Sequence, residues 1–386
     1  MNICIVTGPY PRSPSDSINA GVFVRDFARV LSQQGHNVFV YTHRKKGKAY
    51  LRDDFEVRHF FWLGDDTELS SLNPWRPWDI IKALSLLVNG TKELSRYIAE
   101  KSVDFCLAMW AIPSGYFTYR VKGKIGVPYI VWALGSDIWT TRKYPFGKSV
   151  LRCILNEASY ILADGKLLAQ DVESISGRFC EFLPSSRILP LDHDGEAEID
   201  RSKVNFLFIG RLHPNKGPDL LLEAFQRLMG ETKGAHLYMF GQGPLEYVLR
   251  DMIRNFNLES NVTLGGYASP ETVVEWLRAC DCLVIPSRIE SIPLIFSDAM
   301  QAGTPVIVTD VGDMGKLVSK YEVGLVARRP EELADVLRAF QVRGNWSAYR
   351  KNTKRAWKAF SLDMSAKHIV DLMDRTVKGN PVGTSK

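Results

Sequence analysis

The sequence has no long hydrophobic run and few cysteines, and each shortage argues against a class of protein. None of its apolar stretches reaches the roughly 18 residues that a membrane-spanning helix needs. The first residues, Met1–Gly8, have no basic flank and reach a glycine too soon for an export signal, so we expect a cytoplasmic protein. The six cysteines are scattered without a C-x-x-C pair, which disfavours disulfides and a structural zinc site.

Material for packed cores is abundant. The chain has 386 residues, of which 45% are hydrophobic and 24% charged, a composition far from that of disordered proteins. At about 150 residues per domain, this length predicts two to three domains. The net charge is +6, and basic residues gather at 343–358 and 44–52. Such clusters suit an anionic membrane surface, but solvated helix faces and loops account for them equally well.

Two stretches open in the same way, with an apolar strand, a glycine-containing turn and an amphipathic helix. The first has a strand at 2–6, a helix at 21–34 and a strand at 37–42. The second has a strand at 204–209, a helix at 219–228 and a strand at 236–240. Strands and helices keep alternating afterwards, which predicts an α/β fold with parallel sheets. The further strands are expected at 262–264, 282–285 and 305–309, and the helices at 245–255, 269–279 and 293–302.

The pattern predicts two Rossmann-like, doubly wound parallel-sheet domains, at 1–190 and 203–355. An acidic segment with proline nearby and no usable periodicity, 191–202, is the expected linker. Residues 343–377 look helical, and 379–386 look like a frayed tail. Two such domains on a short linker would face each other across a cleft at the carboxyl edges of both sheets, where ligands of open α/β sheets bind.

The turn Gly210–Gly217 follows a predicted strand and precedes a predicted helix. Backbone N–H groups at a helix start favour anions, and Arg211 and Lys216 add two cations five residues apart. Arginine grips phosphate in a bidentate manner, so this turn can clamp a diphosphate. An ordinary surface loop with two solvated cations is the alternative.

A second candidate lies after the predicted strand 282–285. Pro293 suits the first helical residue and Gly303 the terminating one, so Glu290 falls in the loop and Asp298 within the helix. The backbone N–H groups around Ile292–Leu294 can meet a phosphate or sugar oxygen, and both carboxylates can accept hydrogen bonds from sugar hydroxyls. The alternative is a carboxylate that merely offsets the helix dipole.

These motifs together resemble the retaining family 4 glycosyltransferases of the GT-B fold, over nearly the whole length. The resemblance is strongest across 206–326, in the stretches Phe208–Leu212, Lys216–Gly217, Phe240–Pro244, Asp281–Ser287, Glu290 with Asp298, and Ala302–Val306. It implies an N-terminal acceptor-binding domain, a C-terminal donor-binding domain, and a C-terminal helix, 356–378, that packs back on the N-terminal domain.

The resemblance also implies roles for individual residues. Arg211 and Lys216 would bind the donor diphosphate, Glu290 the donor sugar and Asp298 the ribose hydroxyls. Asp137 would lie on the acceptor side. The remaining donor-binding residues would be Gly21, Gly210, Gly243, Ser291, Ile292, Pro293 and Leu294.

The implied activity is transfer of a sugar from a UDP- or GDP-sugar to a hydroxyl of a glycan or lipid-linked acceptor, with retention at the anomeric carbon. We expect no metal and no cofactor beyond the nucleotide sugar, and no nucleic-acid partner. Envelope polysaccharide or glycolipid synthesis at the inner face of a membrane is the expected setting. A GT-B nucleotide-sugar epimerase and a catalytically silent donor-binding subunit are the alternatives.

Three positions depart from the family pattern. Asp298 stands where glutamate is usual, Leu134 stands where many relatives have a histidine, and Lys316 replaces a glutamate. No catalytic histidine can therefore be assigned. The D-x-D spacing of Asp192 and Asp194 falls in the acidic linker, where metal binding is disfavoured.

The segment 75–88 places two tryptophans and an arginine ahead of an apolar helix. It suits a membrane interface, but a helix packed under the first domain explains the same residues and is favoured over it.

Overall fold

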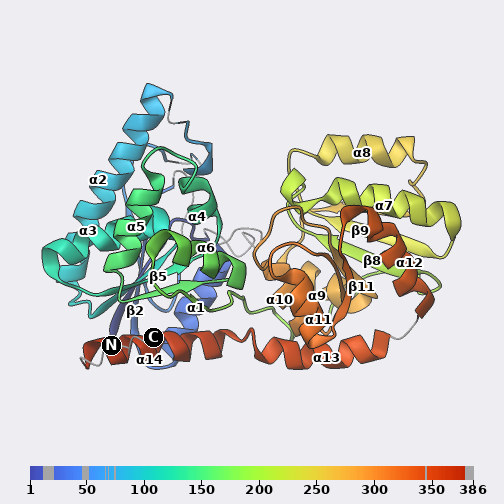
Figure 1. The fold of residues 1–386 in the computed structure, drawn as a ribbon. Coiled ribbons are helices and arrows are strands. Elements are labelled where there is room, and N and C mark those ends of the chain that lie inside the picture. The colour runs from blue at the N-terminus through green and yellow to red at the C-terminus, as the bar shows by residue number, and fades with distance from the viewer. Residues whose placement is uncertain are drawn as a thin grey trace. The chain divides into compact units, whose positions relative to one another are not determined.

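The computed structural model divides into two compact units (Figure 1). Unit 1 comprises Met1–Pro184 and Leu362–Lys386, and unit 2 comprises Ser185–Ser361. The expected frayed tail, 379–386, lies outside the described residues. The structure describes residues 1–11, 21–45, 52–65, 67, 69–73, 75–343 and 346–378.

Unit 1 is built on a seven-stranded parallel sheet in the order β3-β2-β1-β4-β5-β6-β7. The central strands are apolar along their whole length because helices cover both faces of the sheet. The strands are β1 Asn2–Val6, β2 Asn37–His43, β3 Glu56–Phe60, β4 Phe105–Met109, β5 Tyr129–Ala133, β6 Tyr160–Ala163 and β7 Glu181–Phe182.

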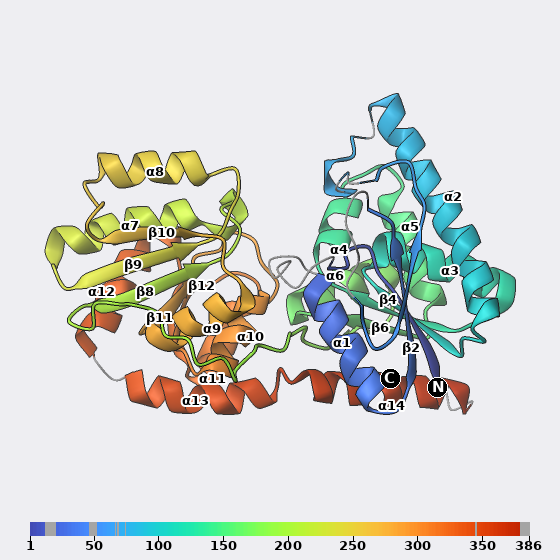
Figure 2. The same cartoon turned by 180° about the vertical axis from the view of Figure 1, so that it is seen from behind.

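Helices on one face of this sheet follow one another from α2 through α3 and α5 to α6, while α1 packs with α14 (Figure 2). The helix α14, at the end of the chain, is thereby part of the same unit as residues 1–184. The helices are α1 Gly21–Gln33, α2 Pro77–Glu100, α3 Tyr116–Ile125, α4 Ser136–Thr141, α5 Gly147–Glu157, α6 Lys166–Ser176 and α14 Leu362–Val377.

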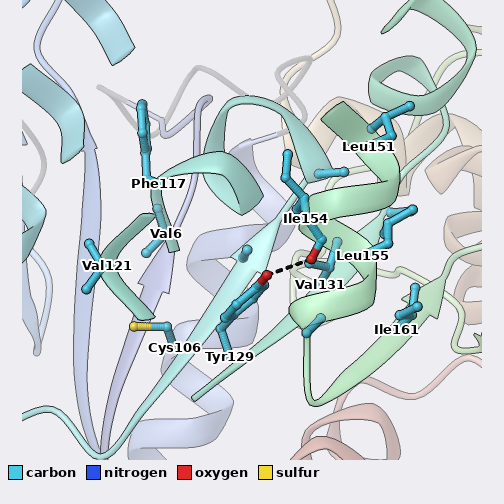
Figure 3. Packing of buried hydrophobic residues seen from close by; sticks show 14 of the residues in the cluster. Val6, Cys106, Phe117, Val121, Tyr129, Val131, Leu151, Ile154, Leu155 and Ile161 are labelled. Carbon is cyan, nitrogen blue, oxygen red and sulfur yellow. Dashed lines mark hydrogen bonds between the residues drawn. The ribbon is translucent and has the colours of Figure 1, made fainter. Parts of the chain in front are cut away.

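The core of unit 1 lies between the sheet and the α2–α6 layer (Figure 3). Phe117 and Val121 from α3 lie near Val6 and Cys106 of the sheet, and Ile154 of α5 lies near Val131. The buried Tyr129 hydroxyl donates to the Ile154 carbonyl oxygen at 2.6 Å, so this polar group is satisfied inside the core.

Unit 2 has a six-stranded parallel sheet in the order β10-β9-β8-β11-β12-β13. Numbered within the unit, this is the order 3-2-1-4-5-6 of a dinucleotide-binding fold, with its switch point between β8 and β11. The strands are β8 Val204–Ile209, β9 Ala235–Phe240, β10 Val262–Gly266, β11 Cys282–Ile285, β12 Val306–Thr309 and β13 Gly324–Ala327.

Local signals set the helix ends of unit 2. Pro218 begins α7, the Ser269 hydroxyl accepts the Thr272 N–H at 3.2 Å ahead of α9, and Gly303 ends α10 in a left-handed conformation. The helices are α7 Pro218–Glu231, α8 Glu246–Asn255, α9 Pro270–Ala279, α10 Leu294–Ala302, α11 Met314–Tyr321, α12 Leu333–Arg343 and α13 Trp346–Lys358.

The division between the units falls at Pro184 and Ser361, away from the expected boundaries at 190 and 355. Side chains of unit 2 hold the segment that was expected to be a linker. Arg278 donates to the carbonyl oxygens of Leu191 at 2.5 Å and His193 at 2.9 Å. The region 343–377 also forms two helices, α13 and α14, which are separated at 359–361.

Helix α2 departs from the packed helix that was favoured for residues 75–88. Leu86, Leu94 and Tyr97 are buried, but Trp75 and Trp78 are exposed. The apolar residues in the first half of α2 therefore occupy two opposite faces of the helix. One face packs on the core of unit 1, and the other is exposed. Within the described residues, no helix has both the length and the apolar content to cross a bilayer.

Candidate functional site

The predicted phosphate turn and the predicted carboxylate loop follow neighbouring strands. Strands β8 and β11 pair in parallel, with Phe206 opposite Cys282. The loops after both strands, 210–217 and 286–293, therefore lie at the same edge of the unit 2 sheet. This is the switch point of the strand order, where open α/β sheets bind their ligands.

Lys216 and Glu290 meet at this edge. Lys216 ends the 3-10 turn Pro214–Lys216, and its Nζ forms an ion pair with the Glu290 carboxylate. Both side chains are partly exposed, so a ligand at this edge can reach them. The structure thus brings together two of the three residues predicted to be catalytic, although 74 positions separate them.

Arg288 joins the two loops and was not predicted. Its guanidinium forms a bidentate ion pair with Asp219 at 2.7 Å for each contact and donates to the Pro214 carbonyl oxygen at 2.8 Å. The backbone N–H of Arg288 also donates to the Asn215 carbonyl oxygen at 2.8 Å. This clamp fixes the spacing between Lys216 and Glu290.

The Arg288–Asp219 contact has an electrostatic signature. Partial burial on its own would raise the pKa of Asp219, but the Arg288 guanidinium outweighs burial and lowers that pKa. The available signal in the sequence was an arginine in the loop after β11 and an aspartate at the start of α7, both near one sheet edge. It was missed because the pairing depends on the adjacency of β8 and β11.

Arg211, the third predicted catalytic residue, follows β8 directly after Gly210, and its side chain is exposed at the same edge. Its neighbour Leu212 is buried and anchors the turn, because the Leu212 N–H donates to the Gln242 carbonyl oxygen at 3.0 Å. A Cβ at Gly243 would lie 2.5 Å from the Leu212 carbonyl oxygen, so glycine allows the two loops to approach.

The Glu290 loop is supported from β12. The Thr309 hydroxyl donates to the Ser287 carbonyl oxygen at 2.6 Å. Gly312 has a φ of +61°, and a Cβ there would collide with the Glu290 carbonyl oxygen. Lys316, which departs from the family pattern four residues later, is exposed on α11.

Helix α10 begins one residue later than predicted. Pro293 is the extended residue before the helix, with φ −72° and ψ 142°, and Leu294 is the first helical residue. The first N–H groups of a helix have no partner inside it. Ser291, Ile292 and Pro293 are buried beside Glu290, so the positive end of α10 lies at the same edge as the ion pair.

Asp298, which was predicted to hold the ribose hydroxyls, is paired with Arg187 in the structure. Its side chain is fully buried, and both of its oxygens accept hydrogen bonds from Arg187 Nε, at 3.0 and 3.1 Å, with a third contact from Nη2 at 2.5 Å. Complete burial raises the pKa of Asp298, and the Arg187 charge opposes the rise. The carboxylate ties α10 to the segment at the start of unit 2.

Asp137, expected on the acceptor side, lies at the start of α4 in unit 1. It is buried in unit 1, where its carboxylate accepts the Ala111 N–H at 2.5 Å and the Leu134 N–H at 3.3 Å. Burial raises its pKa to about 6, against the lowering effect of these backbone groups. Gly21, the predicted donor residue of unit 1, begins α1 with the Tyr10 backbone close against it.

The D-x-D spacing in the expected linker contains a paired histidine. His193 Nε2 lies 2.6 Å from Glu275 Oε1. In the part of the chain that the structure describes, no group of three or more His, Cys, Asp and Glu side chains is arranged to hold a metal ion.

The carboxyl edge of β8 and β11 therefore carries the exposed guanidinium of Arg211, the ammonium of Lys216 and the carboxylate of Glu290. The start of helix α10 lies at the same edge. Cations and N–H groups stabilise a phosphate oxygen, and a carboxylate accepts hydrogen bonds from hydroxyl groups. The combination suits a ligand that has phosphate at one end and a polyol at the other.

Comparisons with known proteins agree with this chemistry. Residues 192–357 match the family model described as "Glycosyl transferases group 1". The chain is 31% identical over 354 residues to mannosylfructose-phosphate synthase from Agrobacterium fabrum, covering 80% of this chain and 75% of the relative. It is 24% identical to the putative teichuronic acid biosynthesis glycosyltransferase TuaC from Bacillus subtilis, over 90% of each chain.

The fold matches as well. The structure of HepE from Anabaena in complex with UDP and glucose superposes with a TM-score of 0.71 at 15% identity, over 97% of this chain and 99% of HepE. Both parallel-sheet units are covered by this match. The chain belongs to the glycosyl transferases group 1 family and is a glycosyltransferase with the GT-B fold.

Proposed function

We propose that this enzyme transfers a sugar from a nucleotide diphosphate sugar to a hydroxyl of a glycan or lipid-linked acceptor, with retention at the anomeric carbon. Unit 2 binds the donor and unit 1 the acceptor. The observation that carries the proposal is the meeting of Lys216 and Glu290 beside Arg211 at the switch point of unit 2. HepE binds UDP and glucose, which favours a UDP-sugar over a GDP-sugar here.

The proposed chemistry depends on charge that develops on the leaving group. The bond between the anomeric carbon and the diphosphate breaks, and negative charge grows on the phosphate oxygens. Arg211, Lys216 and the first N–H groups of α10 stabilise that charge, the strategy that often supplies the largest catalytic effect. Glu290 orients the donor sugar by accepting hydrogen bonds from its hydroxyl groups, and it offsets positive charge at the reacting carbon.

Retention follows when the acceptor attacks the face that the diphosphate leaves. The acceptor oxygen forms the new bond to the anomeric carbon, and its proton passes to a phosphate oxygen of the departing diphosphate. This route asks for no base from the chain, which agrees with Leu134 at the position where many relatives have a histidine. We propose that the reaction needs no metal or further cofactor.

The proposed setting is synthesis of an envelope polysaccharide or glycolipid in the cytoplasm. TuaC, which aligns over 90% of both chains, is named for teichuronic acid biosynthesis, and this likeness supports an envelope polymer as the product.

Substitution of the paired residues tests the site. We expect Lys216→Ala and Glu290→Ala each to lower turnover roughly a hundredfold or more, the usual effect of losing a preorganised charge contact. The measurement is release of nucleotide diphosphate from a panel of UDP- and GDP-sugars with candidate acceptors.

Lys351→Ala and Glu259→Ala remove the same side chains from exposed positions of unit 2 and serve as matched controls. Near-normal turnover in the Lys216 or Glu290 variants contradicts the site. Conversion of the donor into another nucleotide sugar without acceptor would indicate an epimerase. Donor binding without either reaction would indicate a silent subunit.

A further inference from the structure

One face of helix α2 carries a row of exposed apolar side chains. Trp78, Ile81, Leu84 and Val88 follow one another at helical spacing and are between 43% and 61% exposed; we call this row the α2 stripe. Trp75, just before the helix, is 86% exposed. The first turns of α2 extend past the rest of unit 1 in both views (Figures 1 and 2). Leaving this much apolar surface in water is costly unless something covers it.

The helix face that carries the α2 stripe becomes basic further along α2. The next residues on the same face, Lys92 and Arg96, are exposed. Arg96 is 3.5 Å from Glu93, in a pair whose two side chains are largely in water. The face thus has an apolar half at the start of the helix and a cationic half further along.

A second exposed cluster lies between α4 and α5. Phe146 is 83% exposed, and Tyr144 and Val150 are exposed beside it. Lys143 and Lys148 lie on either side of Phe146 in the sequence and are exposed too. This connection repeats the combination of large apolar side chains with lysines.

The two clusters lie at the same end of unit 1. Helices α2, α3 and α5 each precede a strand of one parallel sheet, so all three begin near the carboxyl edge of that sheet. Contacts run from α2 to α3 and from α3 to α5, which places the three side by side on one face.

We propose that the α2 stripe with Trp75, together with the α4–α5 connection, docks unit 1 on an anionic lipid bilayer. Tryptophan rings favour the boundary between headgroups and acyl chains, and exposed leucine, isoleucine and valine side chains enter the apolar layer. Lys92, Lys143 and Lys148 then meet the headgroups, and each cation near an anionic surface strengthens binding.

A second copy of the chain fits this surface less well. Standard protein interfaces use roughly 20–30 residues on each side and are depleted in lysine. The α2 stripe offers four side chains on one projecting helix, and the next exposed residues on its face are Lys92 and Arg96. Exposed apolar side chains next to basic residues match the apolar layer and the anionic headgroups of a bilayer.

Sedimentation of the full chain with lipid vesicles tests the proposal. We expect the protein to pellet with vesicles that contain phosphatidylglycerol and much less with phosphatidylcholine alone. Trp78→Ser with Leu84→Ser should lower vesicle affinity roughly tenfold or more, because two inserted side chains are lost. Lys143→Glu with Lys148→Glu should lower it about tenfold at low salt and less at high salt.

Tyr247→Ser with Val248→Ser, at exposed apolar positions on α8 of unit 2, is the matched control and should bind vesicles as the unmodified protein does. Glycerol phosphate in solution should not compete, because a bilayer and not a free phosphate is the ligand. Failure to bind anionic vesicles, or equal binding by the Trp78 and Leu84 variant, overturns the proposal. So does a dimer that this variant dissociates in analytical ultracentrifugation. Vesicle binding is measured without donor or acceptor, so its outcome is independent of the proposed transferase reaction.

Discussion

At the scale of single residues, Asp298 shows how burial changes the meaning of a motif. Its position eight residues after Glu290 implies a ribose contact, but its carboxylate is fully buried against Arg187. A buried ion pair contributes little net stability as a pair, whereas removal of one partner leaves an uncompensated charge in the interior.

We therefore expect Asp298→Asn to lower the free energy of unfolding by roughly 3–5 kcal/mol. Arg187→Met combined with Asp298→Leu should cost much less, because no charge remains unpaired. Urea unfolding measures both. If Asp298 instead held the ribose, Asp298→Asn would raise the KM for the donor while the unfolding free energy stayed unchanged.

Asp137 leads to a prediction about pH. Its pKa is about 6 in the folded chain, whereas a carboxyl in an unfolded chain titrates near 3.9. Between these values the folded state binds more protons, so the contribution of Asp137 to stability is complete below about pH 4 and is lost as pH rises through 6. Above about pH 7 no further change is expected from this group.

The check compares the unfolding free energy of the unmodified protein with that of Asp137→Asn from pH 4 to 7. The difference should move against the unmodified protein by up to about 3 kcal/mol over this range, since one pKa unit is worth about 1.36 kcal/mol. All other titrating groups are common to both proteins and cancel. Parallel curves would show that Asp137 titrates as in an unfolded chain.

At the scale of elements, loops are positioned by the loops beside them. Arg288 joins the loop after β11 to the start of α7, and Gly312 after β12 lies against the Glu290 backbone. A side chain at Gly312 would need both a left-handed backbone and the space that the Glu290 carbonyl occupies.

Gly312→Ala should therefore displace Glu290 and cost roughly 1–3 kcal/mol of stability. We expect turnover to fall by about tenfold or more, because small misplacements of positioning groups are expensive. Gly123→Ala, in α3 of unit 1 where no atom lies within 4 Å of the added carbon, is the control and should be neutral or slightly stabilising. Unchanged kinetics of Gly312→Ala would indicate that the Glu290 loop is positioned without this contact.

Helix α2 shows the limit of periodicity at this scale. Its first half is apolar on two faces, and from the sequence alone a packed helix was favoured over one at a membrane interface. Leu86 and Leu94 face the sheet, whereas Leu84 and Val88 do not. Whether these residues are buried or exposed depends on how far α2 extends beyond the unit 1 sheet, which the sequence does not give.

At the scale of the whole molecule, two units with separate sheets and cores predict two unfolding transitions. UDP at about one hundred times its dissociation constant should stabilise the unit 2 transition by about 2.7 kcal/mol. The unit 1 transition should not move. Calorimetry with and without UDP measures both effects.

Core variants assign the transitions. Phe117→Leu loosens the unit 1 core and Phe225→Leu the unit 2 core, so each should lower one transition. Lys216→Ala should reduce the shift that UDP causes. A UDP shift confined to the transition that Phe117→Leu lowers would assign the nucleotide to unit 1 and contradict the proposed donor site.

Much of the architecture was predictable because strands and helices alternate with clear turns. The strands Asn2–Val6, Val204–Ile209 and Cys282–Ile285 have the predicted bounds, and most helices begin or end within a few residues of the expected positions. Lys216 and Glu290 could be selected from the sequence because each follows an expected strand, and the structure pairs them. Their roles in the reaction stay predictions. Arg288 was missed because its partner, Asp219, is 69 positions away.

Local sequence determined the two parallel sheets, the turns that carry the cations and the family to which the chain belongs, because these depend on patterns within a few residues. Tertiary structure alone decided which charged groups meet. It paired Lys216 with Glu290 and buried Asp298 against Arg187. It also buried Asp137, whose carboxylate accepts hydrogen bonds from backbone N–H groups, and it left the α2 stripe exposed to water. The physical reason is that partner choice and burial are set by strand order and helix length, which join residues far apart in the chain.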